Sequence, residues 1–120
     1  MKRDWDVIRE ILQKTEELEP NKMLELEDFK DKDAYLVSYQ VRILLEASLI
    51  DAVLSEVMGN EPKNFFIIRL TWEGHEFLDS IRNDSIWMKT KSKILEKGGS
   101  MTFDVVNAVA LNFIKNAISL

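Results

Sequence analysis

Apolar side chains recur at three- and four-residue intervals along most of the chain, which is the spacing of amphipathic helices. In the first such segment, Trp5, Ile8 and Leu12 form part of one apolar stripe, and Asp4 stands where an N-cap residue is preferred. The pattern predicts five helices, at about residues 4–18, 33–48, 72–83, 84–97 and 103–118.

Between the second and third predicted helices, apolar residues follow the pattern of β-strands instead. Residues 50–58 and 64–71 are separated by the sequence Gly-Asn-Glu-Pro-Lys, which is rich in turn-forming residues. These two segments predict a β-hairpin. The alternation of leucine and acidic residues in 23–28 predicts a short edge strand.

The second hairpin strand runs directly into the third helix at Thr71, within a Leu-Thr-x-x-Gly sequence. A strand that returns from a hairpin straight into a helix is typical of the second wing strand of winged-helix domains. We therefore predict a mainly α protein with a small β-hairpin, in the α+β class. Residues 1–84 would form a winged-helix-like domain, and residues 85–120 a C-terminal helical extension packed on the same domain or on a partner subunit.

Composition narrows the possible functions of this chain. It has 120 residues, 46% of them hydrophobic, no cysteine and a formal net charge of -5. Lack of cysteine excludes a disulfide scaffold and fits a reducing cytoplasm. The acidic N-terminal residues do not fit a signal peptide, and polar residues interrupt the most apolar segment, 103–120, so we expect no membrane span.

The charge is unevenly distributed. Residues 1–60 contain 8 Lys and Arg against 14 Asp and Glu, whereas residues 61–120 contain 8 against 7. A nucleic-acid-binding surface usually carries an excess of cations. Any such surface would therefore be local, and the acidic half would suit a basic protein partner.

No residue pattern predicts catalysis. His75 is the only histidine, and Asp79 stands one helical turn later, where a metal-hydrolase helix would carry a second histidine. The chain also has no glycine-rich phosphate loop and no nucleophile elbow. We therefore predict a non-enzymatic protein without a metal site or a cofactor.

Four sequence segments resemble a small family of phage, prophage and bacterial proteins classed as a domain of unknown function. They are MKRDWDVIREIL at the N-terminus, LLEASLI at 44–50, RLTWEGHEFLD at 69–79, and the segment from Trp87 with WMKTK, KGG and the last apolar helix. The resemblance covers essentially the whole chain and implies a winged-helix-like fold. Members of that family often carry His at the position of Gln40 and Gly at the position of Ser48.

In a winged-helix protein, the helix at 33–48 would be the element that enters the DNA major groove. Its outer face, the wing and the fourth helix supply the predicted DNA-binding residues Tyr35, Ser38, Tyr39, Gln40, Arg42, Lys63, Lys89 and Lys93. In the alternative interpretation, Arg42 pairs with Glu46 on a solvated face, and the lysines provide solubility.

The last predicted helix is apolar on more than one face, which requires burial on several sides. It would either fold back onto the chain or form a homodimer or partner interface through Val106, Val109, Ala110, Phe113, Ile114 and Ala117. Two functions follow from these expectations. The chain would be a phage-type DNA-binding transcriptional regulator, or a protein-interaction accessory factor such as an inhibitor or adaptor of a host protein.

Overall fold

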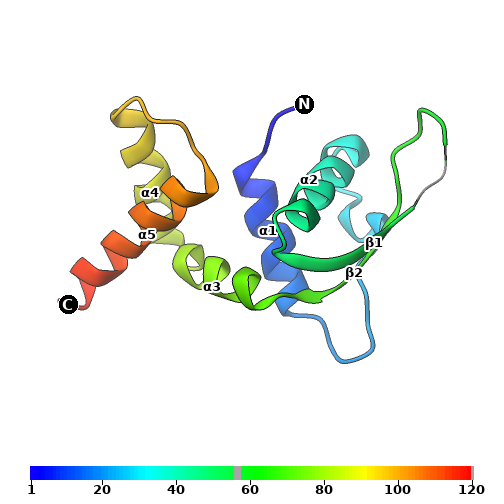
Figure 1. Cartoon of the computed structure of the whole chain (residues 1–120), viewed down its shortest axis with the longest axis horizontal. Helices are drawn as coiled ribbons and strands as arrows, with labels where there is room; N and C mark the ends of the chain where they lie inside the picture. The colour runs from blue at the N-terminus through cyan, green and yellow to red at the C-terminus, as the bar shows by residue number, and fades with distance from the viewer. Residues whose placement is uncertain (56–57, 120) are drawn as a thin grey trace. The chain divides into compact units, whose positions relative to one another are not determined.

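The structure, a computed structural model, describes residues 1–55 and 58–119 and has the predicted α+β class. Within these residues, five α-helices and one 3-10 helix accompany a two-stranded antiparallel sheet (Figure 1). The elements are α1 (Trp5–Glu16), η1 (Leu26–Phe29), α2 (Ala34–Glu46), β1 (Ile50–Leu54), β2 (Phe65–Leu70), α3 (Trp72–Ile81), α4 (Asp84–Glu96) and α5 (Phe103–Ala117).

The chain divides into two compact units, which are described separately below. Unit 1 comprises Met1–His75 and unit 2 comprises Glu76–Leu120, so that the division falls within α3. The boundary at 84/85 expected from the sequence stays a prediction. In the described part of the chain, no helix combines the length and the apolar character needed to cross a bilayer.

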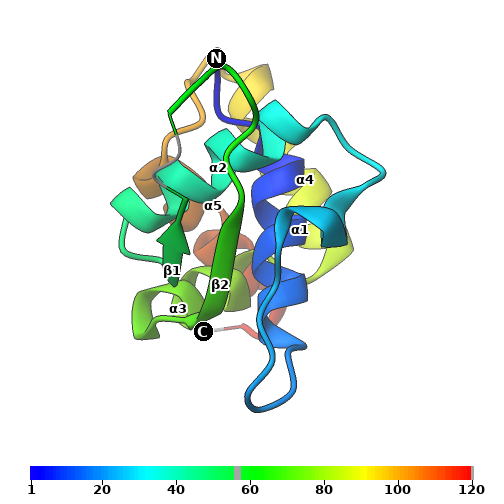
Figure 2. The same cartoon turned by 90° about the vertical axis from the view of Figure 1, so that its right-hand side faces the viewer.

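The core of unit 1 lies where α1 packs against α2 and β2, with β2 running beside α1 (Figure 2). Phe29 and Phe65 stack in a tilted arrangement with ring centroids 6.1 Å apart. The predicted apolar stripes of α1 and α2 face this core. Its most deeply buried side chains are Ile11, Leu12, Phe29, Val37, Val41, Phe65 and Ile67.

Side-chain caps fix the starts of the helices, as the sequence predicted for the first helix at Asp4. The Asp4 carboxylate accepts a hydrogen bond from the Val7 amide at 3.1 Å, and the Asp33 carboxylate accepts from the first turn of α2. Thr102 caps α5 in the same way. Each cap satisfies an amide that has no partner within its own helix. For α4, the cap is Asn83.

The prediction of a strand over residues 23–28 is wrong in its length. Leu24 alone forms an antiparallel bridge, to Ile67, and the chain then turns into η1. The Asp28 carboxylate accepts from the Glu25 amide at 2.7 Å and closes a capping box. Because this box competes with a strand ladder for the backbone amides, the strand ends after one residue pair.

The hairpin forms as predicted, with a shorter β1 and with a bulge that the sequence did not reveal. Val53 pairs with Phe66 and Asp51 with Arg69, but Ala52 pairs with Ile67, so Ile68 is an extra residue in β2. A bulge shifts the inside–outside alternation by one position. Consequently two successive residues of β2, Ile68 and Arg69, are exposed, and Leu70 returns to the core. Residues 56–57 of the predicted first strand lie outside the described residues.

The end of α2 and the start of α3 meet at one tight junction. Ser48 adopts a left-handed conformation with φ of 61°, which explains why a glycine would suit this position. Thr71 Oγ1 donates to the Ser48 carbonyl at 2.6 Å and accepts from the Gly74 amide at 3.0 Å. Thr71 is therefore both the cap of α3 and the residue that joins α3 to the end of α2.

In unit 2, α4 packs against α5. The rings of Phe77 and Phe103 lie with centroids 4.5 Å apart, and Trp87 and Ile94 on α4 are buried. The Lys91 ammonium lies 5.2 Å from the centre of the Trp87 ring. At this distance the positive charge is attracted by the electron-rich face of the ring.

Candidate functional site

Two residues of the predicted reading face of α2 are hydrogen-bonded to the loop between β1 and β2. The Tyr35 hydroxyl donates to the Asn60 carbonyl at 2.6 Å, and the Ser38 hydroxyl donates to the Lys63 carbonyl at 2.9 Å. The structure therefore brings Tyr35, Ser38 and Lys63 together, as the DNA-binding hypothesis requires. Both hydroxyls, however, support the loop through its backbone.

Gln40 corrects the predicted reading face. Its side chain is fully buried, with the amide oxygen accepting from the Asp4 amide at 2.9 Å and the amide nitrogen donating to the Lys2 carbonyl at 3.0 Å. A glutamine reads a base through these same two groups. Because Gln40 uses them to hold the N-terminal segment against α2, we remove it from the candidate surface.

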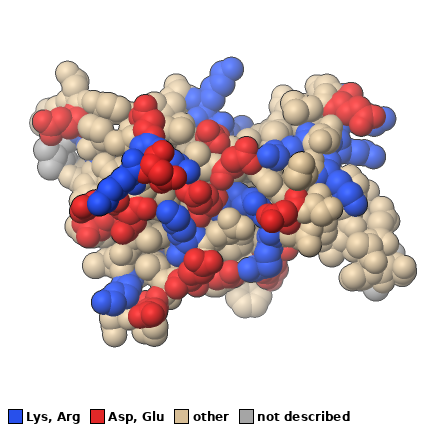
Figure 3. Space-filling model, turned by 180° about the vertical axis from the view of Figure 1, so that it is seen from behind, with Lys and Arg blue, Asp and Glu red and all other residues tan. Residues whose placement is uncertain are grey.

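Tyr39 and Arg42 remain on the outward side of α2, with Arg42 exposed and Tyr39 half-buried. Exposed carboxylates accompany them at Asp33 and Glu46 on the same helix, and at Glu61 in the loop. On the face of the molecule opposite to that of Figure 1, Lys and Arg side chains are interspersed with Asp and Glu (Figure 3). On α2 and its loop, the cations Arg42 and Lys63 are thus accompanied by the three carboxylates named above.

The remaining two predicted DNA contacts, Lys89 and Lys93, are exposed on α4 in unit 2. Their separation of four residues places both on one side of that helix, as the sequence predicted. Lys97, the C-cap of α4, is also exposed. Nothing in their own contacts opposes a role in binding an anion.

The predicted interface residues of α5 divide into three groups. Val106 and Ala110 are fully buried and cannot contact a partner, which corrects the prediction for these two residues. Val109, Phe113 and Ile114 are half-buried, and Ala117 is exposed. Sequence reasoning missed the large apolar residues that α5 does expose, which are Val105 (39%), Leu111 (38%) and Ile118 (60%).

Sequence reasoning also missed an apolar surface on the outer face of the hairpin. Val53 is 56% exposed, and its cross-strand partner Phe66 is 37% exposed. Ile68, the bulge residue, adds a further 46% exposed side chain. The run Phe-Phe-Ile-Ile in β2 carried the signal, since alternation buries only half of such a strand. We call Val53, Phe66 and Ile68 the hairpin face.

A cavity of about 560 Å³ opens next to Ile68. It lies between the segment that follows α1 and the end of β2. Leu18, Met23 and Leu70 contribute apolar walls to it. Its polar lining residues are Thr15, Glu16, Glu19, Asn21, Lys22, Arg69 and His75.

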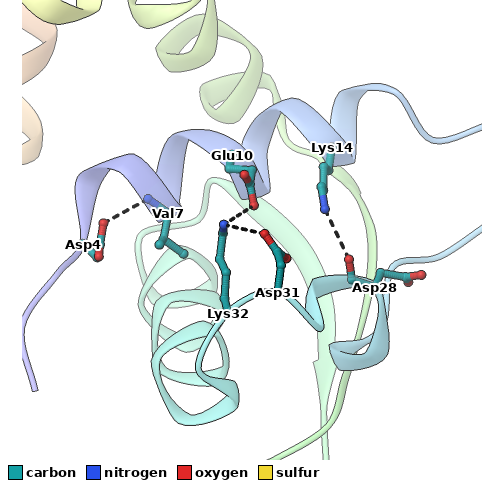
Figure 4. Close-up of polar contacts among 7 residues, drawn as sticks. All are labelled: Asp4, Val7, Glu10, Lys14, Asp28, Asp31 and Lys32. Atoms are coloured by element: carbon teal, nitrogen blue, oxygen red, sulfur yellow. Dashed lines mark hydrogen bonds and ion pairs between the residues drawn. The ribbon is translucent and has the colours of Figure 1, made fainter.

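A cluster of charged side chains between α1 and the segment before α2 has a structural role (Figure 4). Lys32 Nζ lies 3.0 Å from Glu10 Oε2 and 3.1 Å from Asp31 Oδ2. Hydrogen bonds to Glu10 and Asp31 raise the pKa of Lys32, and the hydrogen bond from Lys32 lowers the pKa of Asp31. Lys14 nearby donates to the Asp28 carbonyl at 3.2 Å. These contacts tie α1 to the segment before α2.

The geometry does not assemble a group of ligands around His75. Within residues 1–55 and 58–119, no three His, Cys, Asp or Glu side chains come together in a way that could hold a metal ion. His75 is exposed at the edge of the cavity instead.

Comparison with known proteins gives this chain a family. It belongs to the family described as "Hypothetical protein (DUF2513)", which matches residues 2–100. It is also similar to a Haemophilus influenzae protein described as an uncharacterized protein, with 36% identity over 120 residues that cover 99% of this chain and 100% of the relative. No solved structure matches the chain. The predicted membership of a family classed as a domain of unknown function is thus confirmed.

Proposed function

We propose that this chain is a non-enzymatic, winged-helix-like binding module whose partner is a protein. The order of elements in unit 1 supports the winged-helix part of the proposal. After α1, Leu24 bridges to Ile67, η1 and α2 follow, and β1 and β2 enclose the loop. This is the helix–strand–helix–helix–strand–wing–strand order of a winged helix, with α2 in the place of its recognition helix.

The hairpin face is the observation that carries the protein-binding part. Val53 and Phe66 form a cross-strand apolar pair that is open to solvent, and Ile68 extends it. Aromatic and aliphatic side chains of this kind are the usual centre of a protein–protein contact. DNA would offer this face mainly phosphates and sugars, which give apolar side chains little to bind.

Charge supports the same choice. Residues 1–75 contain 10 Lys and Arg against 16 Asp and Glu, a net charge of -6 for unit 1. DNA affinity depends largely on cations that neutralise phosphates. A protein partner with a basic surface would instead be attracted to unit 1. We place this interaction in the cytoplasm, in keeping with a chain that has no cysteine.

Binding to duplex DNA is the second candidate, and it rests on the exposed position of Arg42 beside Tyr39 on α2. In that case Arg42 would contact bases or phosphates, and Lys63, Lys89 and Lys93 would contact phosphates. The protein would then act as a transcriptional regulator of phage or prophage type.

Fluorescence anisotropy of a labelled mixed-sequence duplex distinguishes the two candidates. For a protein-binding module, we expect that the duplex anisotropy does not change at low salt, with either the wild type or Arg42→Ala. For a DNA-binding protein, affinity would fall steeply with salt, Arg42→Ala would cost about 1–3 kcal/mol, and Lys63→Ala would lower the salt slope by about one unit. That second result would replace our first candidate.

A pull-down from a bacterial lysate tests the hairpin face itself. We expect Phe66→Lys to lose the captured partner, because a charge would be buried in the apolar contact. Met88→Lys is a matched control, since Met88 is a 65% exposed apolar residue on α4. Equal capture by both variants would contradict a contact through the hairpin face.

A further inference from the structure

Resting on the proposed function, we infer that the cavity beside Ile68 receives an anchor residue of the partner: a large apolar side chain that is adjacent in sequence to Arg or Lys. The volume of about 560 Å³ lies within the range of pockets that enclose small ligands. It is therefore large enough for one or two side chains. Leu18, Met23 and Leu70 give this space apolar walls.

The hairpin face and the cavity form one continuous binding surface. Ile68 belongs to both, because the bulge turns it outward at the point where β2 reaches the cavity. Met23, which also lines the cavity, is 51% exposed. A partner segment that covers Phe66 would thus be positioned to place its next large side chain in the cavity. Such deep anchors supply most of the free energy in many protein interfaces.

The end of α1 gives the rim of the cavity its negative character. Glu16 is the last residue of α1, Glu17 is its C-cap, and Glu19 follows two residues later. The C-terminal end of a helix already carries a partial negative charge, so carboxylates there oppose the stability of their own helix. The cost is offset if this end of the helix meets a cationic partner.

The cations on the rim do not cancel this negative potential. Arg69 forms an ion pair of 2.6 Å with Asp51, so these two charges neutralise each other. Lys22 then stands against two exposed carboxylates, Glu19 in the lining and Glu17 at the C-cap of α1. An apolar space with an acidic rim selects an apolar side chain with a cation beside it, and disfavours an acidic segment.

Three synthetic peptides test this inference by NMR on the uniformly ¹⁵N-labelled full chain. They are acetyl-Ala-Arg-Trp-Lys-Ala-amide, its acidic counterpart with Glu on both sides of Trp, and a cationic counterpart with Ala in place of Trp. We expect the first peptide to bind with a dissociation constant of about 1 mM or below and to shift the amide signals of Leu18, Met23 and Ile68. The other two should bind at least about tenfold more weakly.

Two variants tie the response to the cavity. Ile68→Gln should abolish the shifts, and Glu19→Gln should weaken the binding of the first peptide. Leu95→Gln, which changes an exposed apolar residue of α4, should leave them unchanged. Because both altered side chains near the cavity are substantially exposed, the remaining signals should confirm that the variants are folded.

The inference is overturned if the three peptides act alike, if the shifts map elsewhere, or if none binds at about 10 mM. Shifts at the cavity that depend on protein concentration alone would assign it to a second copy of the chain and would also overturn it. None of these results removes the proposed function, because loss of the partner in Phe66→Lys is measured independently.

Discussion

At Gly74 the first turn of α3 passes directly over the end of α2. A Cβ atom at this position would overlap the carbonyl oxygen of Leu49 and would lie 3.4 Å from Leu70 Cβ. The Leu49 carbonyl cannot easily move, since it accepts a hydrogen bond from the Thr71 amide at 3.1 Å. The glycine is therefore required by close approach of two backbones.

Gly74→Ala should destabilise the protein by about 3 kcal/mol, because relief of the overlap requires movement of backbone atoms. Urea denaturation followed by circular dichroism measures this change. Gly99→Ala is the matched control: its Cβ would meet atoms of Ile94 only at 3.5 Å or beyond, so we expect a change within about 0.5 kcal/mol. Similar free energies of unfolding for the two variants would show that the backbone at Gly74 moves without cost, and would contradict this prediction.

Single residues differed in how well their roles could be predicted from the sequence. Thr71 was predictable as a cap because the signal is local and lies next to the helix it caps. The burial of Gln40 was not predictable, since its two partners are backbone groups of residues 36 and 38 positions earlier. Because Gln40 stands among both polar and apolar neighbours on its helix, the local sequence does not indicate a contact so far away along the chain.

Among the elements, α1 shows how an amphipathic helix is fixed by polar contacts as well as by its apolar stripe. Its inward side carries Ile11 and Leu12, which are fully buried. Its flank carries Glu10, which approaches Lys32 in the segment before α2 (Figure 4). These contacts set the position of α1 along the start of α2, which apolar contacts alone specify poorly.

Lys32→Gln should therefore reduce stability in a pH-dependent manner. The lowered pKa of Asp31 means that its share of the stabilisation is present above its ordinary pKa and is lost as the pH falls through the lowered value. The raised pKa of Lys32 means that its share is present below its ordinary pKa of 10.5 and is lost as the pH rises through the raised value.

The difference between wild type and Lys32→Gln should consequently be flat from about pH 5 to 9 and should shrink on both sides. Thermal denaturation at a series of pH values measures it. Lys30→Gln is the control, because the Lys30–Glu27 pair is longer, at 3.5 Å, with both side chains at least 75% exposed. If the stability difference between wild type and Lys32→Gln were the same at all pH values, Lys32 would act through packing of its aliphatic chain. That result would contradict a role for its ion pairs.

At the scale of elements, the sequence predicted all five helices and the hairpin, because periodicity and caps are local signals. It failed at residues 23–28, where alternation of Leu24 and Leu26 resembles a strand but Asp28 closes a capping box. It also failed to reveal the bulge at Ile68, which depends on the register of two paired strands. The hairpin face and the cavity were missed for the same reason.

For the whole molecule, α5 raises the question of self-association. It exposes Val105, Leu111 and Ile118, and these apolar side chains form no part of the core described for unit 2. We propose that α5 forms a homodimer contact, since burial of such residues is favourable by roughly 25 cal/mol per Å² of apolar surface. This extends the homodimer hypothesis to residues that the sequence analysis did not select.

Leu111→Asp should then convert a dimer into monomers, because a carboxylate would be placed in an apolar contact. Multi-angle light scattering should give twice the chain mass of 14.0 kDa for the wild type and 14.0 kDa for the variant. Ser92→Asp, on an exposed position of α4, controls for the added charge. A wild-type protein that is monomeric throughout the measured concentrations would contradict the homodimer.

The extra residue in β2 also affects how relatives of this chain should be aligned. Without Ile68, Arg69 would follow Ile67 directly and the strand would alternate regularly between core and solvent, with Leu70 still inside. The same core therefore accommodates either length of this strand. A one-residue gap at this place in an alignment would report the loss of a surface feature, with no change in fold.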